Sequence, residues 1–467
     1  MSDAVEILAR QRDAFLRDGP PTLEARKADL KALRQVVTAR RRDIEQAVDL
    51  DFGGRSPRET ALLDILGVVQ GIDYLTRNLK RFMKPERRHV AATFQMGRAH
   101  VEYQPLGVIG IMSPWNYPFL LAMVPLATAI AAGNRAVLKP SELTPRTSQL
   151  MKDMLASIFP EEKAAVILGD AEVGAAFSGL PFDHLFFTGS TQVGKAVMKA
   201  ASENLVPVTL ELGGKSPTII EKGHASESNV ASVVFGKLTN GGQTCVAPDY
   251  VFVHEDDLDA FTDAFGKAVA KSYPNGPSTI DFASIVSERH FGRLNGLLDD
   301  ARQKGARVVE VGNDAPSATS RIRVLPPTLV FDATDEMAVM REEIFGPILP
   351  VRTYREIGEV IGYINARPRP LALYVFGDEK SEDCRAVLAR TISGNVGINN
   401  TILHVAQDDL PFGGVGASGT GAYHGIEGFR RMSHAKGVFV QGRWSLPTLL
   451  RAPFGRLTDW TLAFLLR

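Results

Sequence analysis

Apolar residues recur at helical spacing through the first eighty residues of the chain. Residues 2–19 carry both acids and bases, and their periodicity predicts an amphipathic helix. A second amphipathic helix is predicted over 22–50, where apolar residues recur at sums of three and four until Gly53 and Gly54 end it. Residues 56–59, Ser-Pro-Arg-Glu, have the spacing of a capping box with proline at the first helical position. We therefore expect a third helix that runs to about Met83.

The pattern changes from helical spacing to alternation after these helices. Residues 90–104 predict a hairpin of two extended segments around Met96-Gly97-Arg98. Beyond Gly107, short β-branched runs alternate with helical stretches, which is typical of a parallel sheet with helices on both faces. The first series comprises strands at VIGIMS, AVLK, AAVIL and HLFFT and helices over 118–132, 145–159, 171–178 and 191–203. The second, from about Leu210, comprises strands at PTIIE, YVFVHE, VLPPTLVF, ALYVFG and GNVGIN and a helix over 227–237. The prediction is an α/β protein with two doubly wound domains.

Composition narrows the functional classes. The length of 467 residues allows two to four domains. Because 53 basic residues balance 53 acidic ones, nothing favours nucleic acid as a partner. Two cysteines are too few for a disulfide framework, and the N-terminus lacks the apolar core of a signal peptide, so a cytoplasmic protein is expected. The longest apolar run, 119–132, is shorter than the ~20 residues that span a bilayer, so we expect a buried helix there.

Two glycine-rich segments approximate nucleotide-binding motifs without completing them. Residues 189–196, GSTQVGKA, lack the final hydroxyl residue that would hold Mg²⁺ in a P-loop. What remains is a strand-to-helix turn that suits a phosphate or pyrophosphate, or a plain tight turn. Residues 414–419, GVGASG, follow no convincing apolar strand and have no acidic partner about twenty residues on, so a glycine-rich loop is expected. The nearest histidines, His424 and His434, are ten apart, and no metal is expected.

Three side chains are candidates for covalent chemistry. Cys245 lies in a polar glycine loop, NGGQTCVAP, where either a nucleophilic or a structural cysteine fits, whereas Cys384 in a predicted helix is expected to be structural. Glu211 lies between two leucines, where desolvation should raise its pKa toward that of a useful base, although a buried structural glutamate fits too. Asn116 follows the first parallel strand, at the edge where such sheets collect ligands.

Seven ordered motifs between about residues 20 and 440 resemble the NAD(P)-dependent aldehyde dehydrogenases. They are PWNYP (114–118), LKPSE (138–142), FTGST (187–191), LELGGKSP (210–217), GGQTCVAP (241–248), EEIFGP (342–347) and PFGGVGASG (411–419). Tyr117 and the ending AYHGIEGFRRMSHAKGVF are similar to the class 3 and coniferyl aldehyde dehydrogenase branch.

The resemblance implies a role for each candidate. Cys245 would be the nucleophile, Glu211 the general base, and the Asn116 side chain with the Cys245 backbone N–H the oxyanion hole. Tyr117 is a candidate for the substrate tunnel. The residues assigned to the cofactor are Trp115, Lys139, Glu142, Gly189, Ser190, Glu343 and Phe345. A carboxylate at position 142 would accept a ribose 2′-OH and repel a 2′-phosphate, which favours NAD, although similar class 3 enzymes also use NADP.

The reaction implied is thiolate addition to an aldehyde, hydride transfer to the nicotinamide, and hydrolysis of the thioester with the help of Glu211. The aldehyde is open between aromatic ones, such as coniferyl aldehyde, and medium- to long-chain aliphatic ones. The alternatives are a coenzyme A-acylating enzyme and a non-catalytic member of the fold.

The resemblance also implies a domain plan. Residues 1–83 and 106–210 would form the cofactor domain, and residues 211–420 the catalytic domain. Residues 84–105 and a strand at 433–441 would bridge to a second copy, so a homodimer is expected, since an exposed strand needs a partner.

The C-terminal residues 443–467 differ in composition from the rest, with four arginines against one aspartate. Apolar residues at helical spacing predict an amphipathic tail helix with one apolar face. Three roles are open for residues 446–467: packing on the protein or its dimer partner, covering the substrate entrance, and peripheral contact with a membrane interface.

Overall fold

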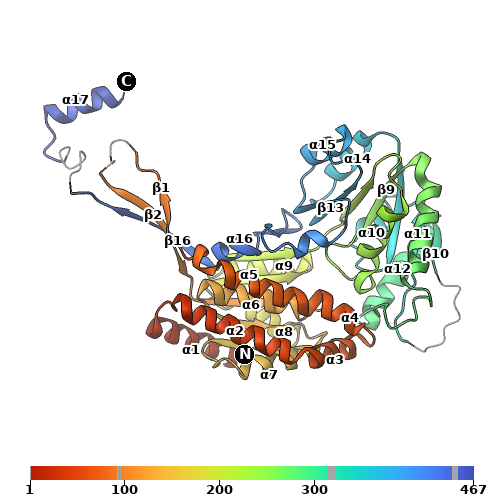
Figure 1. Ribbon diagram of the computed structural model, residues 1–467, viewed down its shortest axis with the longest axis horizontal. Coiled ribbons are helices and arrows are strands. Elements are labelled where there is room, and N and C mark those ends of the chain that lie inside the picture. The colour runs from red at the N-terminus through yellow and green to blue at the C-terminus, as the bar shows by residue number, and fades with distance from the viewer. Residues whose placement is uncertain (1, 92–93, 95, 313–320, 444–450, 467) are drawn as a thin grey trace.

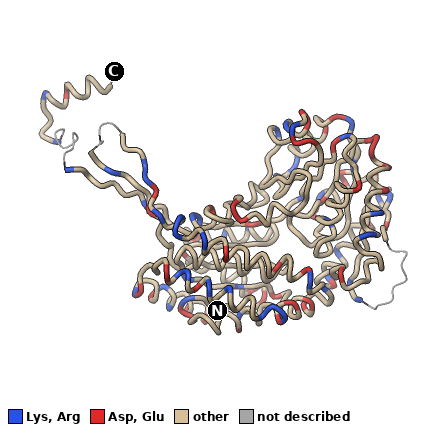
Figure 2. Tube along the Cα trace, in the orientation of Figure 1, with Lys and Arg blue, Asp and Glu red and all other residues tan. Residues whose placement is uncertain are grey.

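The computed structural model describes residues 2–91, 94, 96–312, 321–443 and 451–466. Two lobes lie side by side, and a slender arm projects from one of them with the C-terminal helix at its far end (Figure 1). Basic and acidic positions are interspersed over both lobes (Figure 2), as expected from the balanced composition.

The N-terminal region is helical, as predicted, with two corrections. Its helices are α1 (Ser2–Asp18), α2 (Leu23–Ala39), α3 (Arg41–Phe52), α4 (Pro57–Thr60), the π-helical turn η1 (Ala61–Ile65) and α5 (Leu66–Phe82). The single helix expected over 22–50 is divided at Arg40, whose φ of −97° and ψ of 17° interrupt it. The capping box is wrong as well, because Ser56 makes no capping bond and donates to Asp281 at 3.3 Å. A local pattern does not show that a distant partner competes for the same side chain.

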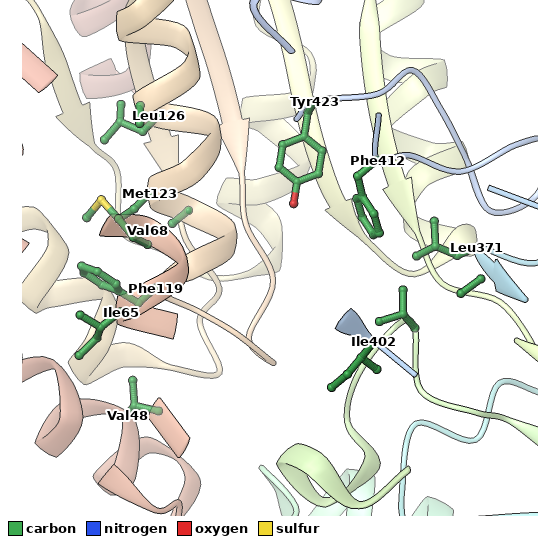
Figure 3. Packing of buried hydrophobic residues seen from close by; sticks show 14 of the residues in the cluster. Val48, Ile65, Val68, Phe119, Met123, Leu126, Leu371, Ile402, Phe412 and Tyr423 are labelled. Atoms are coloured by element: carbon green, nitrogen blue, oxygen red, sulfur yellow. The ribbon is translucent and has the colours of Figure 1, made fainter. Parts of the chain in front are cut away.

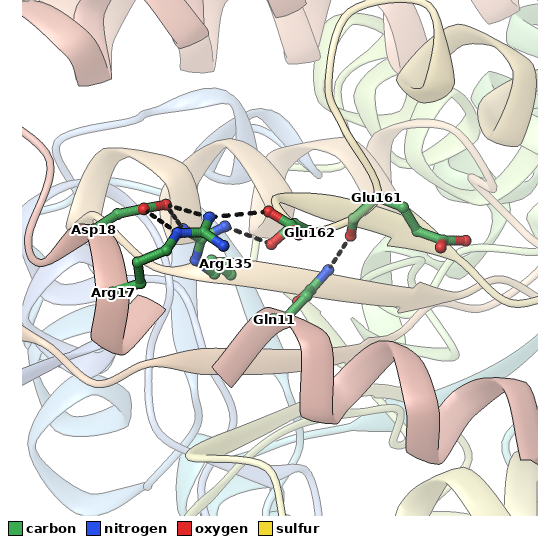
Figure 4. A network of polar contacts seen from close by, with 6 residues as sticks. All are labelled: Gln11, Arg17, Asp18, Arg135, Glu161 and Glu162. Carbon is green, nitrogen blue, oxygen red and sulfur yellow. Dashed lines mark hydrogen bonds and ion pairs between the residues drawn. The ribbon is translucent and has the colours of Figure 1, made fainter. Parts of the chain in front are cut away.

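Polar contacts hold α1 against the first sheet (Figure 4). Gln11 donates to the carbonyl of Glu161 at 2.8 Å, and Arg135 at the start of strand β4 donates to Asp18 and to the carbonyl of Glu162, both at 2.6 Å. The N-terminal helix is therefore part of the lobe.

The first lobe contains a six-stranded sheet of order β15-β7-β6-β3-β4-β5, parallel except for β15. Its strands are β3 (Val108–Met112), β4 (Arg135–Lys139), β5 (Ala164–Val166), β6 (His184–Gly189), β7 (Val208–Leu212) and β15 (Gly419–Thr420). The crossover helices are α6 (Leu120–Ala132), α7 (Pro145–Ala156), α8 (Ala171–Ser178) and α9 (Thr191–Ser202). The alternation predicted for this region is confirmed, and the limit expected between residues 210 and 211 falls inside β7.

Helix α6 is buried, as expected from its continuous apolar sequence. Phe119 and Met123 lie against Ile65 and Val68 in the core of this lobe (Figure 3). This packing fixes the start of α6, and with it residues 113–119, the segment that carries Asn116.

The second lobe contains a seven-stranded sheet of order β10-β11-β12-β9-β8-β13-β14, parallel except for β10. Its strands are β8 (Pro217–Ile220), β9 (Tyr250–His254), β10 (Arg307–Glu310), β11 (Thr328–Phe331), β12 (Ile348–Tyr354), β13 (Ala372–Phe376) and β14 (Asn395–Ile398). Its helices are α10 (Glu227–Leu238), α11 (Leu258–Ser272), α12 (Glu288–Gln303), α13 (Ala338–Arg341), α14 (Ile357–Asn365) and α15 (Glu382–Arg390). Cys384 on α15 is fully buried in this core, which fits the structural role expected for it.

The arm is a three-stranded antiparallel sheet of β1 (Glu86–Arg88), β2 (Arg98–Pro105) and β16 (Ser433–Val440), and α16 (Gly425–Arg431) precedes β16. The expected hairpin is present, but its first strand precedes residue 90. Strand β16 pairs with β2 over the whole length of both strands. Helix α17 (Arg456–Leu465) confirms the predicted tail helix. Among the described residues, no helix combines the length and the apolar character needed to cross a membrane.

Candidate active site

Cys245 follows a tight glycine loop between α10 and β9. Residues Thr239–Gly242 form a short 3₁₀ turn in which Asn240 and Gly241 have φ of 54° and 59°. A Cβ at Gly242 would lie 2.3 Å from the carbonyl oxygen of Gly346, so only glycine allows this close approach. The loop thereby brings Cys245 near the segment that carries Glu343.

The Cys245 thiol is partly buried and lines a cavity of about 170 Å³. Burial, together with the nearby carboxylates of Glu343 and Glu211, raises the pKa of this thiol to about 12. The free site therefore holds a neutral thiol at pH 7, and a base must take its proton before the sulfur can attack.

Glu211 lies on β7 and is buried, as expected from its two leucine neighbours. Neither carboxylate oxygen has a hydrogen-bond partner among the described residues. Burial raises its pKa well above the ordinary value, which confirms the direction predicted from the sequence. A buried carboxyl without partners, close enough to influence Cys245, suits proton transfer.

Asn116 is buried where the first lobe contacts the cysteine loop of the second. Its side-chain amide donates to the carbonyl of Gln243 in the cysteine loop at 3.1 Å. The next residue, Tyr117, lines the cavity together with Cys245, and its hydroxyl lies 2.7 Å from that of Thr244. Two segments 127 residues apart in the sequence are therefore joined beside the thiol.

Lys139 and Glu142 lie at the carboxyl edge of the first sheet. Lys139 ends β4 opposite Met112 of β3, and its ammonium donates to Glu142 at 3.2 Å. Lys139 is buried, whereas Glu142 is partly exposed. This is the edge where a doubly wound sheet binds its ligands.

Ser190 caps α9 immediately after Gly189 ends β6, and its hydroxyl accepts from the Val193 amide at 3.4 Å. The strand-to-helix turn predicted over 189–196 is thus present. A cavity of about 550 Å³ lies beside it, between the start of α9 and Glu343. By contrast, residues 414–419 form a loop that ends in β15, as expected for them.

Glu343 lines this cavity, and Phe345, two residues further along the chain, contacts Trp115. One oxygen of the Glu343 carboxylate is buried without a hydrogen-bond partner among the described residues, and burial raises the pKa of Glu343 to about 8. Phe345 has a φ of 53° and packs edge-on against Trp115 with ring centroids 5.3 Å apart. Of the assigned residues, Cys245 and Tyr117 line the first cavity and Glu343 lines the second, whereas Lys139 and Gly189 end strands of the first sheet.

Three residues near the site were missed at the sequence level. Arg55 is fully buried next to Asn116, Asp408 lines the cavity of Cys245, and Lys237 is buried with no hydrogen-bond partner for its ammonium among the described residues. Burial lowers the pKa of Lys237 to about 8. Arg55 adjoins the Gly53-Gly54 turn, which gave no chemical signal. Within the described residues, no group of three or more histidine, cysteine or acidic side chains is arranged to hold a metal.

Comparisons with known proteins point to one family. The profile described as "Aldehyde dehydrogenase family" matches residues 2–438. The chain is 49% identical to a probable coniferyl aldehyde dehydrogenase of Pseudomonas aeruginosa, over 96% of this chain and 93% of that protein. It is 48% identical to a coniferyl aldehyde dehydrogenase of a Pseudomonas species, over 98% of this chain and 95% of that protein. A substrate-bound Staphylococcus aureus AldH structure superposes with a TM-score of 0.91 at 35% identity, covering 98% of this chain and 99% of that one.

Proposed function

The chain belongs to the aldehyde dehydrogenase family, and from this premise we propose how its own residues carry out the reaction. It is an NAD(P)-dependent enzyme that oxidises an aldehyde to the carboxylic acid. The observation that carries the proposal is that an unpartnered buried carboxyl, whose charge acts on the Cys245 thiol, and an amide anchored to the cysteine loop both lie beside that thiol.

Cys245 is the nucleophile. Its proton passes to a carboxylate of the site, and the sulfur adds to the aldehyde carbon, which leaves a tetrahedral oxyanion. The Asn116 side chain and the Cys245 backbone N–H stabilise this oxyanion. Loss of a hydride from the carbon of this adduct, for which bound NAD(P)⁺ would be the acceptor, leaves a thioester on Cys245. Glu211 then takes a proton from the water that hydrolyses this thioester, which releases the carboxylic acid and restores the thiol.

The residues of the larger cavity and the sheet edge fit a nicotinamide dinucleotide. Lys139 and Glu142 would hold the adenosine ribose, and the turn Gly189-Ser190 at the start of α9 would hold the pyrophosphate. Glu343, whose buried oxygen has no other described partner, would bind the nicotinamide ribose, with Phe345 and Trp115 around the ring. Bound NAD(P)⁺ supplies the hydride acceptor of the reaction. Residues 1–83 and 106–210 then act as the cofactor domain, and residues 211–420 as the catalytic domain.

The proposed cofactor preference is for NAD over NADP. The Glu142 carboxylate accepts from Lys139 through one oxygen and is exposed enough to accept a ribose 2′-OH as well, while its charge opposes a 2′-phosphate.

The proposed substrate is an aromatic aldehyde of the coniferyl type. Two of the relatives compared above carry that name. The cavity of Cys245 is apolar and rich in rings, since Tyr117, Phe412 and Tyr423 line it and Phe412 stacks on His424 with centroids 5.1 Å apart. A flat aromatic substrate gains offset or edge contacts in such a cavity that an alkyl chain does not.

Asp408 adds a carboxyl group to the otherwise mostly apolar lining of this cavity. It is half-buried, burial raises its pKa, and no described residue forms a hydrogen bond or an ion pair with its carboxylate. A phenolic hydroxyl on the far side of the substrate ring would find its acceptor there.

Matched substrates test this assignment. We expect kcat/KM for 4-hydroxycinnamaldehyde to exceed that for 4-methoxycinnamaldehyde, which lacks the donor, and that for hexanal. Asp408→Asn should lower the ratio of kcat/KM for 4-hydroxycinnamaldehyde to that for 4-methoxycinnamaldehyde about tenfold, because the acceptor loses its charge. The control Asp409→Asn should not change it, since Asp409 bonds to Tyr74 and does not line the cavity. A wild-type preference for alkanals would contradict the aromatic assignment.

We further propose that the arm joins two copies of the chain into a homodimer. Strand β16 forms one edge of the three-stranded sheet, and β1 forms the other. An exposed edge strand offers unpaired backbone groups to a second chain. Sedimentation of the pure protein should give a mass twice the 50.8 kDa of one chain. The enzyme in a cytoplasmic extract should sediment at the same position. A peripheral membrane contact through residues 446–467 remains part of the proposal and is tested by deletion below.

A further inference from the structure

Arg55 lies directly behind the oxyanion-hole candidate. Its side chain is fully buried, and its Nη1 donates to the backbone carbonyl of Asn116 at 3.2 Å. The same guanidinium lies over the Tyr117 ring, 4.9 Å from the ring centroid. One side chain thus contacts two consecutive residues, of which Tyr117 lines the Cys245 cavity and Asn116 bonds to the cysteine loop.

The charge of Arg55 is balanced by Asp64, which lies on the π-helical turn and is also fully buried. The two side chains approach to 2.9 Å. The other Asp64 oxygen accepts from the amide of Leu120 at 3.0 Å, at the start of α6. Single π-helical turns are often found at functional sites, and this one directs the aspartate inward.

The carbonyl of Asn116 has a second donor from the opposite lobe. The side-chain amide of Asn240 donates to it at 2.8 Å, and the Asn240 backbone amide donates to Glu59. Asn116 is therefore held at three points, because its own side chain also donates to Gln243 at 3.1 Å. The resulting network joins α4, the segment after β3 and the cysteine loop.

Stability alone does not account for this arginine. Removing a buried charge pair in favour of apolar side chains is often neutral or stabilising, since the desolvation of both charges is avoided. Nε of Arg55 also lacks a hydrogen-bond partner among the described residues, which adds to the cost of burying it. The rigid, planar guanidinium of Arg55 is explained instead by its contacts with the Asn116 carbonyl and the Tyr117 ring.

We propose that Arg55 is a positioning residue that fixes the Asn116 peptide so that its side-chain amide meets the developing oxyanion. The proposal rests on the oxyanion role proposed for Asn116. An oxyanion donor acts only when it is held in place before the charge develops, and a misplacement of about 1 Å can cost roughly 10²-fold in rate.

A double-mutant cycle with the full-length enzyme tests it. Arg55→Lys keeps a charge for Asp64 but loses the planar fork, so kcat should fall about 10- to 100-fold while the dissociation constant of NAD stays within twofold. Asn116→Ala alone should lower kcat roughly 10²- to 10³-fold. In the Asn116→Ala background, Arg55→Lys should cost less than about threefold, because the group that it positions is gone.

Arg26→Lys is the matched control. Arg26 is a buried arginine of the same lobe that donates to backbone carbonyls, including that of Ala131 at 3.0 Å, near the C-terminal end of α6, whereas Asn116 precedes the start of that helix. It should change kcat by less than about twofold in both backgrounds.

The possible outcomes separate two failures. If the losses from Arg55→Lys and Asn116→Ala multiply, Arg55 acts independently of Asn116 and the proposal is overturned. If Asn116→Ala leaves kcat unchanged, the oxyanion role itself is wrong. Arg55→Met guards against a folding defect, and if neither Arg55 variant folds by circular dichroism, a structural role replaces the positioning one.

Discussion

Burial determines the protonation state of the two side chains that are proposed to do the chemistry. It raises the pKa of the Cys245 thiol to about 12 and that of Glu211 well above the ordinary value. At a given pH, each group is therefore protonated to a greater extent than the same residue would be when exposed to water. The carboxylates near the thiol make it a poorer nucleophile at rest, so the enzyme depends on proton transfer within the site.

Cys245→Ala should abolish aldehyde oxidation and any esterase activity but leave NAD binding intact, since the cofactor residues lie on other segments. Steady-state assays and fluorescence titration with NAD measure the two properties. Cys384→Ala is the control, and it should keep its activity because that thiol is buried in the second core. Retention of more than a few per cent of activity in the first variant would remove Cys245 as the nucleophile.

Glu211→Gln should slow thioester hydrolysis more than hydride transfer, so a burst of NADH followed by a slow steady state is expected. A base must be deprotonated to act, and a raised pKa moves the pH range in which Glu211 is deprotonated upward. The kcat of the wild type should therefore rise with pH along a limb above the ordinary glutamic acid range of about 4.3. This limb should be lost in the variant. Stopped-flow kinetics across pH would refute the role by showing equal losses in burst and steady state.

At the scale of elements, the carboxyl edge of the first sheet brings together residues that are distant in sequence. Lys139 ends β4, Gly189 ends β6, and Leu212 ends β7 beside Gly189. Parallel strands in register make such an edge a binding platform, because every strand ends there with its loop free to vary.

Glu142→Gln should improve the use of NADP relative to NAD. Because Glu142 is partly exposed, the repulsion that it exerts on a 2′-phosphate is screened to about 1 kcal/mol, or about fivefold in the ratio of kcat/KM values. Kinetics with both cofactors measure this ratio. An unchanged ratio would mean that other residues select the cofactor. Glu172→Gln, at the exposed start of α8, serves as a charge-matched control.

At the scale of the whole molecule, the arm and α17 extend away from both lobes (Figure 1). Trp460 and Phe464 stack with centroids 6.2 Å apart and are 70% and 69% exposed in the single chain. Such an apolar face requires a partner.

Deletion of residues 446–467 distinguishes the three roles of the tail. Loss of co-sedimentation with anionic liposomes, with kinetics unchanged, would support a membrane interface. A selective change of kcat/KM for long aldehydes would support an entrance cover. A fall of several degrees in Tm alone would support packing on the protein or its dimer partner. If the full-length protein does not bind such liposomes at low salt, the membrane role is wrong.

Local patterns were sufficient for most of the elements and singled out candidate groups, whose proposed roles came from the family resemblance. Alternating β-branched runs and helices specified both sheets, since strand and helix periods are local properties. The leucines that flank Glu211 indicated its raised pKa, because the neighbours on a buried strand are themselves buried. The polar glycine loop indicated Cys245 as a candidate, because a structural cysteine more often lies in an apolar stretch.

Tertiary structure decided what depends on distant partners. Ser56 and Glu59 bind residues more than 180 positions away instead of capping their helix, and β16 pairs with β2 across more than 300 residues. Arg55 gave no signal, because the value of a buried cation depends on the carboxylate and carbonyl that meet it only in the folded protein. Long-range pairing and desolvation are properties of the assembled core, which a sequence window does not contain.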